Sequence, residues 1–178
     1  MARFTNRFGV NRFEADEYYR LALDAYRKKS STSLDAAVNY ITDAIDIYPR
    51  PEYYAARGLF YLDDGLTDKA QADFEQALKL FPMEMLAHYG RGIIAYDDKN
   101  WDEAIAHFAD AYRADAKRPE TVYYLALAYH HKGENQIARQ VMEVAYNLFP
   151  EADKRRNDAN RWLRELDKIL RQKASGGS

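Results

Sequence analysis

The residues of this sequence that could take part in chemistry are four histidines and a few pairs of adjacent carboxylates. The histidines are His88, His107, His130 and His131, and all of them fall on predicted helices. His130 and His131 are neighbours, so on a helix their side chains point about 100° apart and cannot hold one metal ion together. We therefore expect no metal site and no cofactor.

The adjacent carboxylates Asp63 and Asp64, and likewise Asp97 and Asp98, fall at the ends of predicted helices, where solvated acidic residues are common. General acid–base catalysis needs such groups in a dry pocket that shifts their pKa, and the sequence indicates no such pocket. No phosphate-binding loop, serine elbow or dinucleotide fingerprint is present. The absence of cysteine excludes disulfides, thiolate metal sites and cysteine nucleophiles. We expect a protein that is not an enzyme.

The composition is that of a soluble globular protein, with 47% hydrophobic and 30% charged residues in a chain of 178. A net charge of −2 provides no global field that would attract nucleic acid or an anionic membrane. No run approaches the roughly 18 apolar residues of a membrane helix, and the N-terminus lacks the apolar core of a signal peptide. We expect a cytoplasmic protein with no nucleic-acid partner, no membrane insertion and no small-molecule substrate.

The charge is distributed unevenly along the chain. Residues 1–13 contain three arginines and no acid, and residues 151–178 contain eight bases and five acids. The long stretch between them is therefore acidic. The last four residues, Ser-Gly-Gly-Ser, are left out of the fold argument.

An internal repeat with a period of 34 residues organises the sequence. The segments 58–82, 92–116 and 126–150 align at this offset without a gap. Shared slots hold Ala70, Ala104 and Ala138, then Ala77, Ala111 and Ala145, and a large apolar residue at Phe74, Phe108 and Met142. An earlier, more diverged copy brings Ala37, Ile41, Ala44 and Pro49 into the same register.

This pattern resembles the tetratricopeptide repeat (TPR), over about 136 of the 178 residues. The resemblance implies an all-α fold, an α-solenoid of antiparallel helix-turn-helix hairpins. Small residues at Gly58, Gly92 and Ala126 leave room for the partner helix, and prolines end the second helices. Some slots depart from the family pattern. Leu23 stands where the other repeats have a small residue, and Ala95 stands where they have a tyrosine. Ala116 replaces the proline, Lys99 replaces the turn glycine, and Arg57 and Arg91 replace the usual leucine.

The repeat divides the chain into an arm (1–13), a solenoid (14–150), a C-terminal capping helix (151–173) and a flexible tail (174–178). The repeats are expected at about 14–50, 51–84, 85–118 and 119–150. First helices are predicted near 14–29, 51–64, 85–98 and 119–132, second helices near 33–48, 67–81, 101–115 and 135–149, and the cap near 152–172. The cap carries an apolar stripe at Trp162, Leu163, Leu166, Ile169 and Leu170.

The resemblance implies that the first helices line a concave face on which ligands lie. The first repeat offers Glu17, Arg20, Asp24 and Arg27 to this face. The remaining slots hold Glu52, Ala55, Leu59, Leu62, Asp63, Leu86, Tyr89, Ile93, Tyr96, Asp97, Glu120, Tyr123, Leu127, His130 and His131. Tyrosine, leucine and isoleucine with an acidic rim indicate a surface for another protein or peptide that has hydrophobic and basic residues. Some of the tyrosines are expected to pack against neighbouring repeats instead.

Chaperone-binding members of the family hold a peptide's C-terminal carboxylate with a clamp of Lys, Asn and Arg. The corresponding slots here are Glu52, Ala56, Leu86 and Gly90, which disfavours the acidic tails of cytosolic chaperones. The leading hypothesis is therefore a protein-interaction scaffold or adaptor of another specificity. The alternative is an architectural or assembly subunit that uses its convex face, its cap and its arm.

The N-terminal arm contains Arg-Phe three times, at residues 3–4, 7–8 and 12–13. On a helix Phe4 and Phe8 would share a face and Phe13 would lie roughly opposite, so we do not expect one clean amphipathic helix. One interpretation is a frayed terminus. The other is that the arm packs into an acidic groove of its own chain or of a neighbouring subunit, which would give a homo-oligomer.

Overall fold

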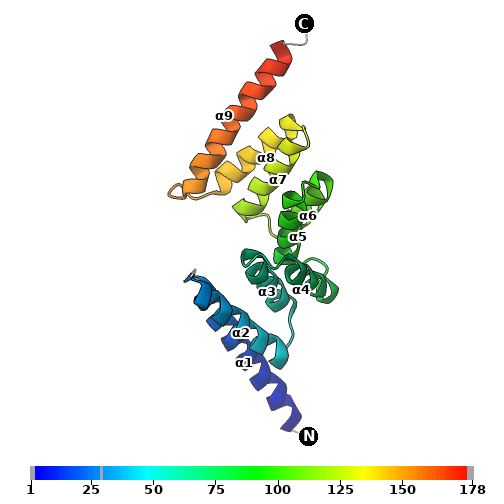
Figure 1. Cartoon of the computed structure of the whole chain (residues 1–178), viewed down its shortest axis with the longest axis vertical. Helices are drawn as coiled ribbons and strands as arrows, with labels where there is room; N and C mark the ends of the chain where they lie inside the picture. Colours follow the sequence, from blue (N-terminus) through cyan, green and yellow to red (C-terminus); the bar gives the residue numbers. More distant parts are fainter. Residues whose placement is uncertain (1–2, 29, 176–178) are drawn as a thin grey trace. The chain divides into compact units, whose positions relative to one another are not determined.

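The computed structural model describes residues 3–28 and 30–175, and every regular element in those ranges is an α-helix (Figure 1). The helices are α1 (Arg3–Tyr26), α2 (Ser31–Ile47), α3 (Pro51–Asp63), α4 (Thr67–Leu80), α5 (Met85–Asp97), α6 (Trp101–Ala114), α7 (Pro119–His131), α8 (Asn135–Leu148) and α9 (Lys154–Ser175). They belong to two compact units, residues 1–90 and 91–178. The predicted all-α solenoid of helical hairpins is confirmed, and α2 to α8 begin and end within two residues of the predicted positions.

The helix starts follow from local capping chemistry. Ser30 and Ser33 form a capping box at α2: the Ser33 backbone N–H donates to Ser30 Oγ (3.2 Å), and the Ser30 N–H donates to Ser33 Oγ (2.9 Å). Pro51 and Pro119 occupy the first positions of α3 and α7, where a helix needs no N–H donor. Each helix start depends on only a few neighbouring residues, so the repeat period together with the capping residues and prolines predicts where the helices begin.

The turns inside the hairpins use the left-handed backbone region. Gly65 (φ 74°) and Gly133 (φ 91°) follow α3 and α7, and Lys99 (φ 60°) occupies the equivalent position after α5. A side chain in this region costs roughly 1–2 kcal/mol, because its Cβ crowds the following carbonyl oxygen. The third hairpin therefore carries backbone strain that its neighbours avoid.

Changing Lys99 to glycine is expected to raise the free energy of unfolding of the second unit by about 0.5–1 kcal/mol. The relief of left-handed strain exceeds the extra entropy of glycine in the unfolded chain. Chemical denaturation measures the gain. The matched controls Gly65→Ala and Gly133→Ala should each lose about 1 kcal/mol, and a Lys99→Gly protein no more stable than the wild type would contradict this explanation.

Within the hairpins, an aromatic ring fills the space that a glycine leaves open. The fully buried ring of Phe74 on α4 lies against Gly58 of α3 and against Gly90 in the middle of α5, and a Cβ added to Gly58 would lie 2.5 Å from it. Phe108 occupies the same place over Gly92. In the first hairpin Leu23 and Ile41 share the space between α1 and α2, both as part of the core. Leu23 is larger than the glycine of the other hairpins, and Ile41 opposite it is correspondingly smaller than their phenylalanine.

Arg57, in a slot where leucine is usual, is held by a carboxylate from the neighbouring helix. Its guanidinium donates twice to Asp73 of α4, at 2.7 and 2.8 Å, and once to Thr42 of α2 at 3.1 Å. The rings of Tyr54 and Tyr61 flank it at 5.7 and 5.8 Å. Hydrogen bonds and aromatic contacts therefore replace the apolar packing that the slot otherwise supplies.

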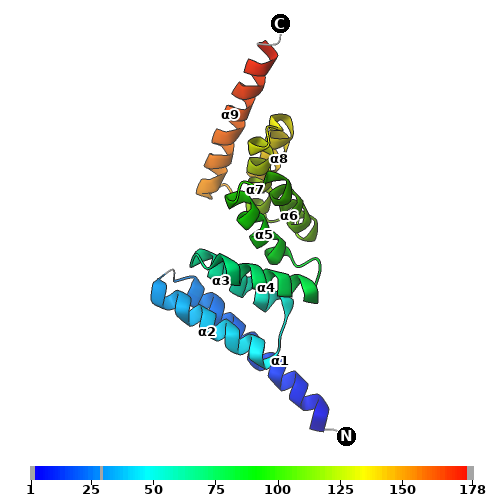
Figure 2. The same ribbon diagram turned by 45° about the vertical axis from the view of Figure 1, so that its right-hand side comes forward.

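The first helix starts earlier than the repeat indicates, because α1 begins at Arg3 and not near residue 14. Its N-terminal turns extend past the end of α2, beside which the rest of the helix packs (Figure 2). No proline interrupts residues 3–26, and Arg12 pairs with Asp16 one turn later at 3.9 Å, so the helix continues through the arm. At the other end α9 reaches Ser175, and residues 176–178 of the predicted tail lie outside the described residues.

Candidate functional site

In the first unit, the predicted binding slots form a surface of mixed character. Leu59 and Leu62 on α3, and Leu86 and Tyr89 on α5, are partly buried, which leaves apolar area in contact with solvent. Ala55, in contrast, is fully buried and belongs to the core. The apolar part of the predicted surface in this unit is therefore carried by leucine and one tyrosine.

The second unit presents aromatic rings from its first helices. Tyr96 at the end of α5 packs edge-on against Trp101 (ring centroids 5.3 Å apart) and Tyr124 (5.7 Å). Burial, and then the neighbouring Tyr124, Tyr123 and Asp97, raise the pKa of Tyr96 to about 12, so its hydroxyl stays neutral at physiological pH. Tyr123 of α7 is also partly buried and lies 5.9 Å from Tyr124. Part of each ring is thus committed to internal packing and part is exposed.

Helix α9 adds a tryptophan to this surface. The centroid of the Trp162 ring lies 5.2 Å from that of the His130 ring. Across the same two helices Arg155 of α9 donates to Glu120 at the start of α7, at 2.5 Å. These contacts place α9 beside α7 as the first helix of a further repeat would lie. We call Tyr96, Tyr123, His130 and Trp162 the aromatic face.

The two adjacent histidines have separate environments, as their spacing on a helix predicts. His130 Nδ1 is 2.6 Å from Asn135 Oδ1, which fixes the orientation of the ring. His131 is exposed and stacks on Trp101 with ring centroids 4.7 Å apart. Burial against this ring, and then the neighbouring His130, lower the pKa of His131, so it is mostly neutral near pH 7. The pair contributes ring surface to the site.

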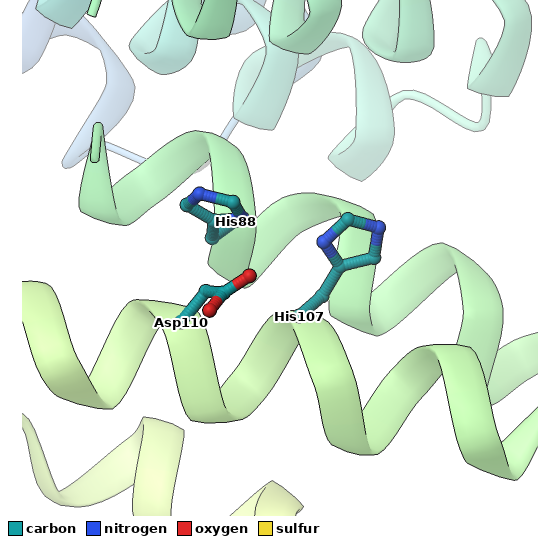
Figure 3. A group of neighbouring side chains, drawn as sticks. All are labelled: His88, His107 and Asp110. Carbon is teal, nitrogen blue, oxygen red and sulfur yellow. The ribbon is translucent and has the colours of Figure 1, made fainter. Parts of the chain in front are cut away.

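A group of possible metal ligands combines His88 of α5 with His107 and Asp110 of α6 (Figure 3). One ligand atom from each lies within 4.8 Å of the others. His88 Nε2 is 2.9 Å from the Pro82 carbonyl oxygen, and His107 Nε2 is 3.7 Å from Glu103. Each of the three side chains also has a further polar or ring partner. We assign no ion to the group, since polar and ring contacts within the protein account for it, and the expectation of no metal site stays a prediction.

The carboxylates predicted as an acidic rim are mostly paired within the chain. Glu17 pairs with Arg20, Asp24 with Arg27, Glu52 with Arg50 and Glu120 with Arg155, and Asp63 accepts a hydrogen bond from Tyr26. Asp97 is the exception, since no described residue forms an ion pair or hydrogen bond with it. Burial, and then the adjacent Asp98, raise the pKa of Asp97. The rim is therefore far less available to a basic ligand than its composition indicates.

Two differences separate the predicted site from the structure. Leu127 is buried in the core of the second unit, with 7% of its surface exposed, so it is not available to a ligand. Trp162 belongs to the aromatic face but was assigned only to the cap. The sequence does carry a signal for it, because one more 34-residue step from α7 falls on the start of α9.

Helical hairpins of this kind, whose first helices expose aromatic and aliphatic side chains, define a helical-repeat protein. Residues 55–119 match the family model described as tetratricopeptide repeat. The chain contains tetratricopeptide repeats over these residues, and proteins with this fold generally serve as protein-interaction scaffolds. Among the described residues no helix is both long and apolar enough to cross a membrane.

One curated relative and several solved structures are similar to this chain. Superkiller complex protein 3 of mouse (Mus musculus) is 29% identical over 127 residues, a match that covers 71% of this chain and 8% of that protein. The structure of MamA, residue 41 to the end, from Desulfovibrio magneticus RS-1 has a TM-score of 0.62 at 20% identity, covering 89% of this chain and 96% of that chain. The Arabidopsis OM64 TPR domain has a TM-score of 0.61 at 21% identity, covering 68% and 98%. The first TPR of Spaghetti (RPAP3), bound to the HSP90 peptide SRMEEVD, has a TM-score of 0.60 at 16% identity, covering 68% and 93%.

Proposed function

We propose that this chain is a scaffold or adaptor that binds a segment of another protein on the exposed faces of its first helices. The observation that carries the proposal is the aromatic face of the second unit. Tyr96, Tyr123 and Trp162 are held by neighbouring rings yet keep exposed area. Rings that are already ordered lose little entropy on binding, and aromatic side chains dominate the energetics of protein interfaces.

The chemistry of these faces favours a partner segment with hydrophobic anchors. Leu59 and Leu62 in the first unit and Ile93 in the second offer aliphatic contacts, and such groups select apolar side chains. A preference for basic residues rests mainly on Asp97, because the other rim carboxylates are already paired. One or two basic residues near the anchors are therefore favoured, with a modest weakening of binding by salt.

The partner differs in kind from the acidic peptide bound by the RPAP3 domain. The slots that hold a terminal carboxylate in the family are occupied here by Glu52, Ala56, Leu86 and Gly90. Ala56 and Gly90 are buried, and Glu52 already pairs with Arg50. None of these groups offers a donor to a carboxylate, so a peptide ending in acidic residues is disfavoured.

A capture experiment with the native extract tests the proposal. The triple variant Tyr89→Ala, Tyr96→Ala and Tyr123→Ala should lose partner capture by about 100-fold or more, since each aromatic contact at the centre of an interface is worth about 1–2 kcal/mol. The double variant Tyr40→Ala and Tyr48→Ala is the matched control, because both tyrosines are 36% exposed on or next to α2, a second helix. Circular dichroism checks that all variants stay helical. Undiminished capture by the triple variant would shift the assignment to the assembly function.

The second candidate function is that of an assembly subunit that forms homo-oligomers through its arm. It is favoured by Phe13, which is 74% exposed on α1. A ring this exposed offers apolar area that contact with a second copy would cover. Because α1 is helical from Arg3, such a contact would use the side of a helix and not an extended segment.

A further inference from the structure

Helix α2 presents an acidic face to solvent. Asp35, Asp43 and Asp46 are all exposed, and α2 contains no basic residue. At 100° per residue the three carboxylates fall within an arc of about 80° and extend over about 16 Å of helix. No described residue forms an ion pair or hydrogen bond with any of them. Their mutual repulsion is therefore uncompensated within the part of the chain that the structure describes.

Helix α9 presents a basic face of similar length. Five of its exposed bases fall within an arc of about 100°, namely Lys154, Arg161, Arg164, Lys168 and Arg171, while the exposed Arg155 and Lys173 lie outside it. Arg161 and Lys168 have carboxylate neighbours, at 2.9 and 3.9 Å. For Lys154, Arg164 and Arg171 the described residues supply no ion-pair partner. The stretch from Arg161 to Arg171 spans about 15 Å of helix.

The two faces match in charge and in spacing, and most of their charged side chains have no ion-pair partner among the described residues. Arg164 and Arg171 are separated by about 10 Å along α9, and Asp35 and Asp43 by about 12 Å along α2, so both pairs of charges can meet across two helices packed side by side. Tyr40 and Tyr48, each 36% exposed, supply apolar area on and next to α2. A polyanion such as nucleic acid suits the α9 face alone. It would be repelled by the acidic stretch that makes up most of the chain.

We infer that the basic face of α9 in one copy of this chain docks on the acidic face of α2 in a second copy. The contact joins two different surfaces, so it is heterologous, and a pair keeps the α2 face of one copy and the α9 face of the other free for further copies. Exposed ion pairs contribute roughly 0–1 kcal/mol each, which makes the association weak and strongly dependent on salt. This inference does not rest on the aromatic face, which belongs to other residues.

Charge reversal tests the contact in the full chain. At low salt and about 100 µM protein, light scattering and sedimentation should show association that 0.5 M salt reverses. The variants Arg164→Glu/Arg171→Glu and Asp35→Lys/Asp43→Lys should each associate at least 10-fold more weakly than wild type. An equimolar mixture of the two should recover association, because the intact α2 face of one variant meets the intact α9 face of the other and the two reversed faces also attract. Lys79→Glu/Lys117→Glu, which changes the same charge at exposed sites off both faces, should behave as wild type.

Four results would overturn the inference. The first is a wild-type protein that stays monomeric at low salt, and the second is association that charge reversal on α9 does not weaken. The third is a mixture of the two variants that does not associate. The fourth is loss of association when residues 1–13 are deleted, which would assign the contact to the arm. If reversal on α9 removes binding to heparin while the wild type stays monomeric, the face binds a polyanion instead. The variant Tyr89→Ala, Tyr96→Ala and Tyr123→Ala should self-associate as the wild type does. A failure of the proposed binding on the first helices can therefore be distinguished from a failure of the contact between α9 and α2.

Discussion

Replacing Gly90 with alanine should destabilise the first unit by about 3 kcal/mol, although glycine to alanine normally favours a helix by about 1 kcal/mol. The sign reverses because the added Cβ would enter the ring of Phe74, at distances that real side chains do not adopt. The ring has no room to retreat, since Gly58 of α3 lies against it and the ring is fully buried. Chemical denaturation followed by circular dichroism measures the loss.

The coupling between Gly90 and Phe74 provides the control. Changing Phe74 to leucine alone should cost about 1–2 kcal/mol, as a smaller side chain leaves part of the space empty. In that background the alanine at position 90 has room, so its further cost should fall below about 1 kcal/mol. A Gly90→Ala protein as stable as the wild type would show that the ring is not confined by the two glycines.

Removing the carboxylate of Asp73 should also cost about 3 kcal/mol. The side chains of Arg57 and Asp73 are only 17% and 9% exposed, so the variant Asp73→Ala leaves a largely buried guanidinium without its two strongest hydrogen bonds. Loss of a buried charged partner costs far more than the pair contributes net, because the remaining charge stays desolvated. The free energy of unfolding from urea titration measures the effect.

Two comparisons separate this effect from ordinary side-chain loss. The double variant Arg57→Leu/Asp73→Leu removes both charges and restores the apolar residue usual in the arginine slot, so its stability should lie within about 1 kcal/mol of wild type. Asp24→Ala breaks an exposed ion pair with Arg27 and should change stability by less than about 0.5 kcal/mol. Equal losses for Asp73→Ala and the double variant would contradict a role for the unpaired charge.

The helices were predictable because their signals are local. Pro51, Pro119 and the turn residues near Gly65 and Gly133 mark the ends of elements directly, and the repeat transfers each boundary to the next copy. The start of α1 was not predictable in the same way, since no proline or cap marks where the repeat ends and the arm begins. Helix continuation there depends on the absence of a stop signal.

The details of the candidate site depend on contacts between distant residues, which a periodic pattern does not encode. The partner of Arg57 lies 16 residues away on the next helix, and that of Glu120 lies 35 residues away on α9. The sequence therefore shows how many carboxylates the rim contains but does not show that most of them are paired within the chain. The sequence predicts only a capping role for Trp162. An amphipathic stripe predicts that its residues face the protein, but it does not indicate which side chains at the edge of the stripe remain partly exposed.

Amide hydrogen exchange on the chain bound to its captured partner tests the central claim most directly. If a partner segment lies on the first helices, protection should increase in Pro51–Asp63, Met85–Asp97 and Pro119–His131, and around Trp162. The second helices Thr67–Leu80, Trp101–Ala114 and Asn135–Leu148 should exchange as in the free protein. Protection confined to those second helices, with the first helices unchanged, would contradict binding on the first-helix faces.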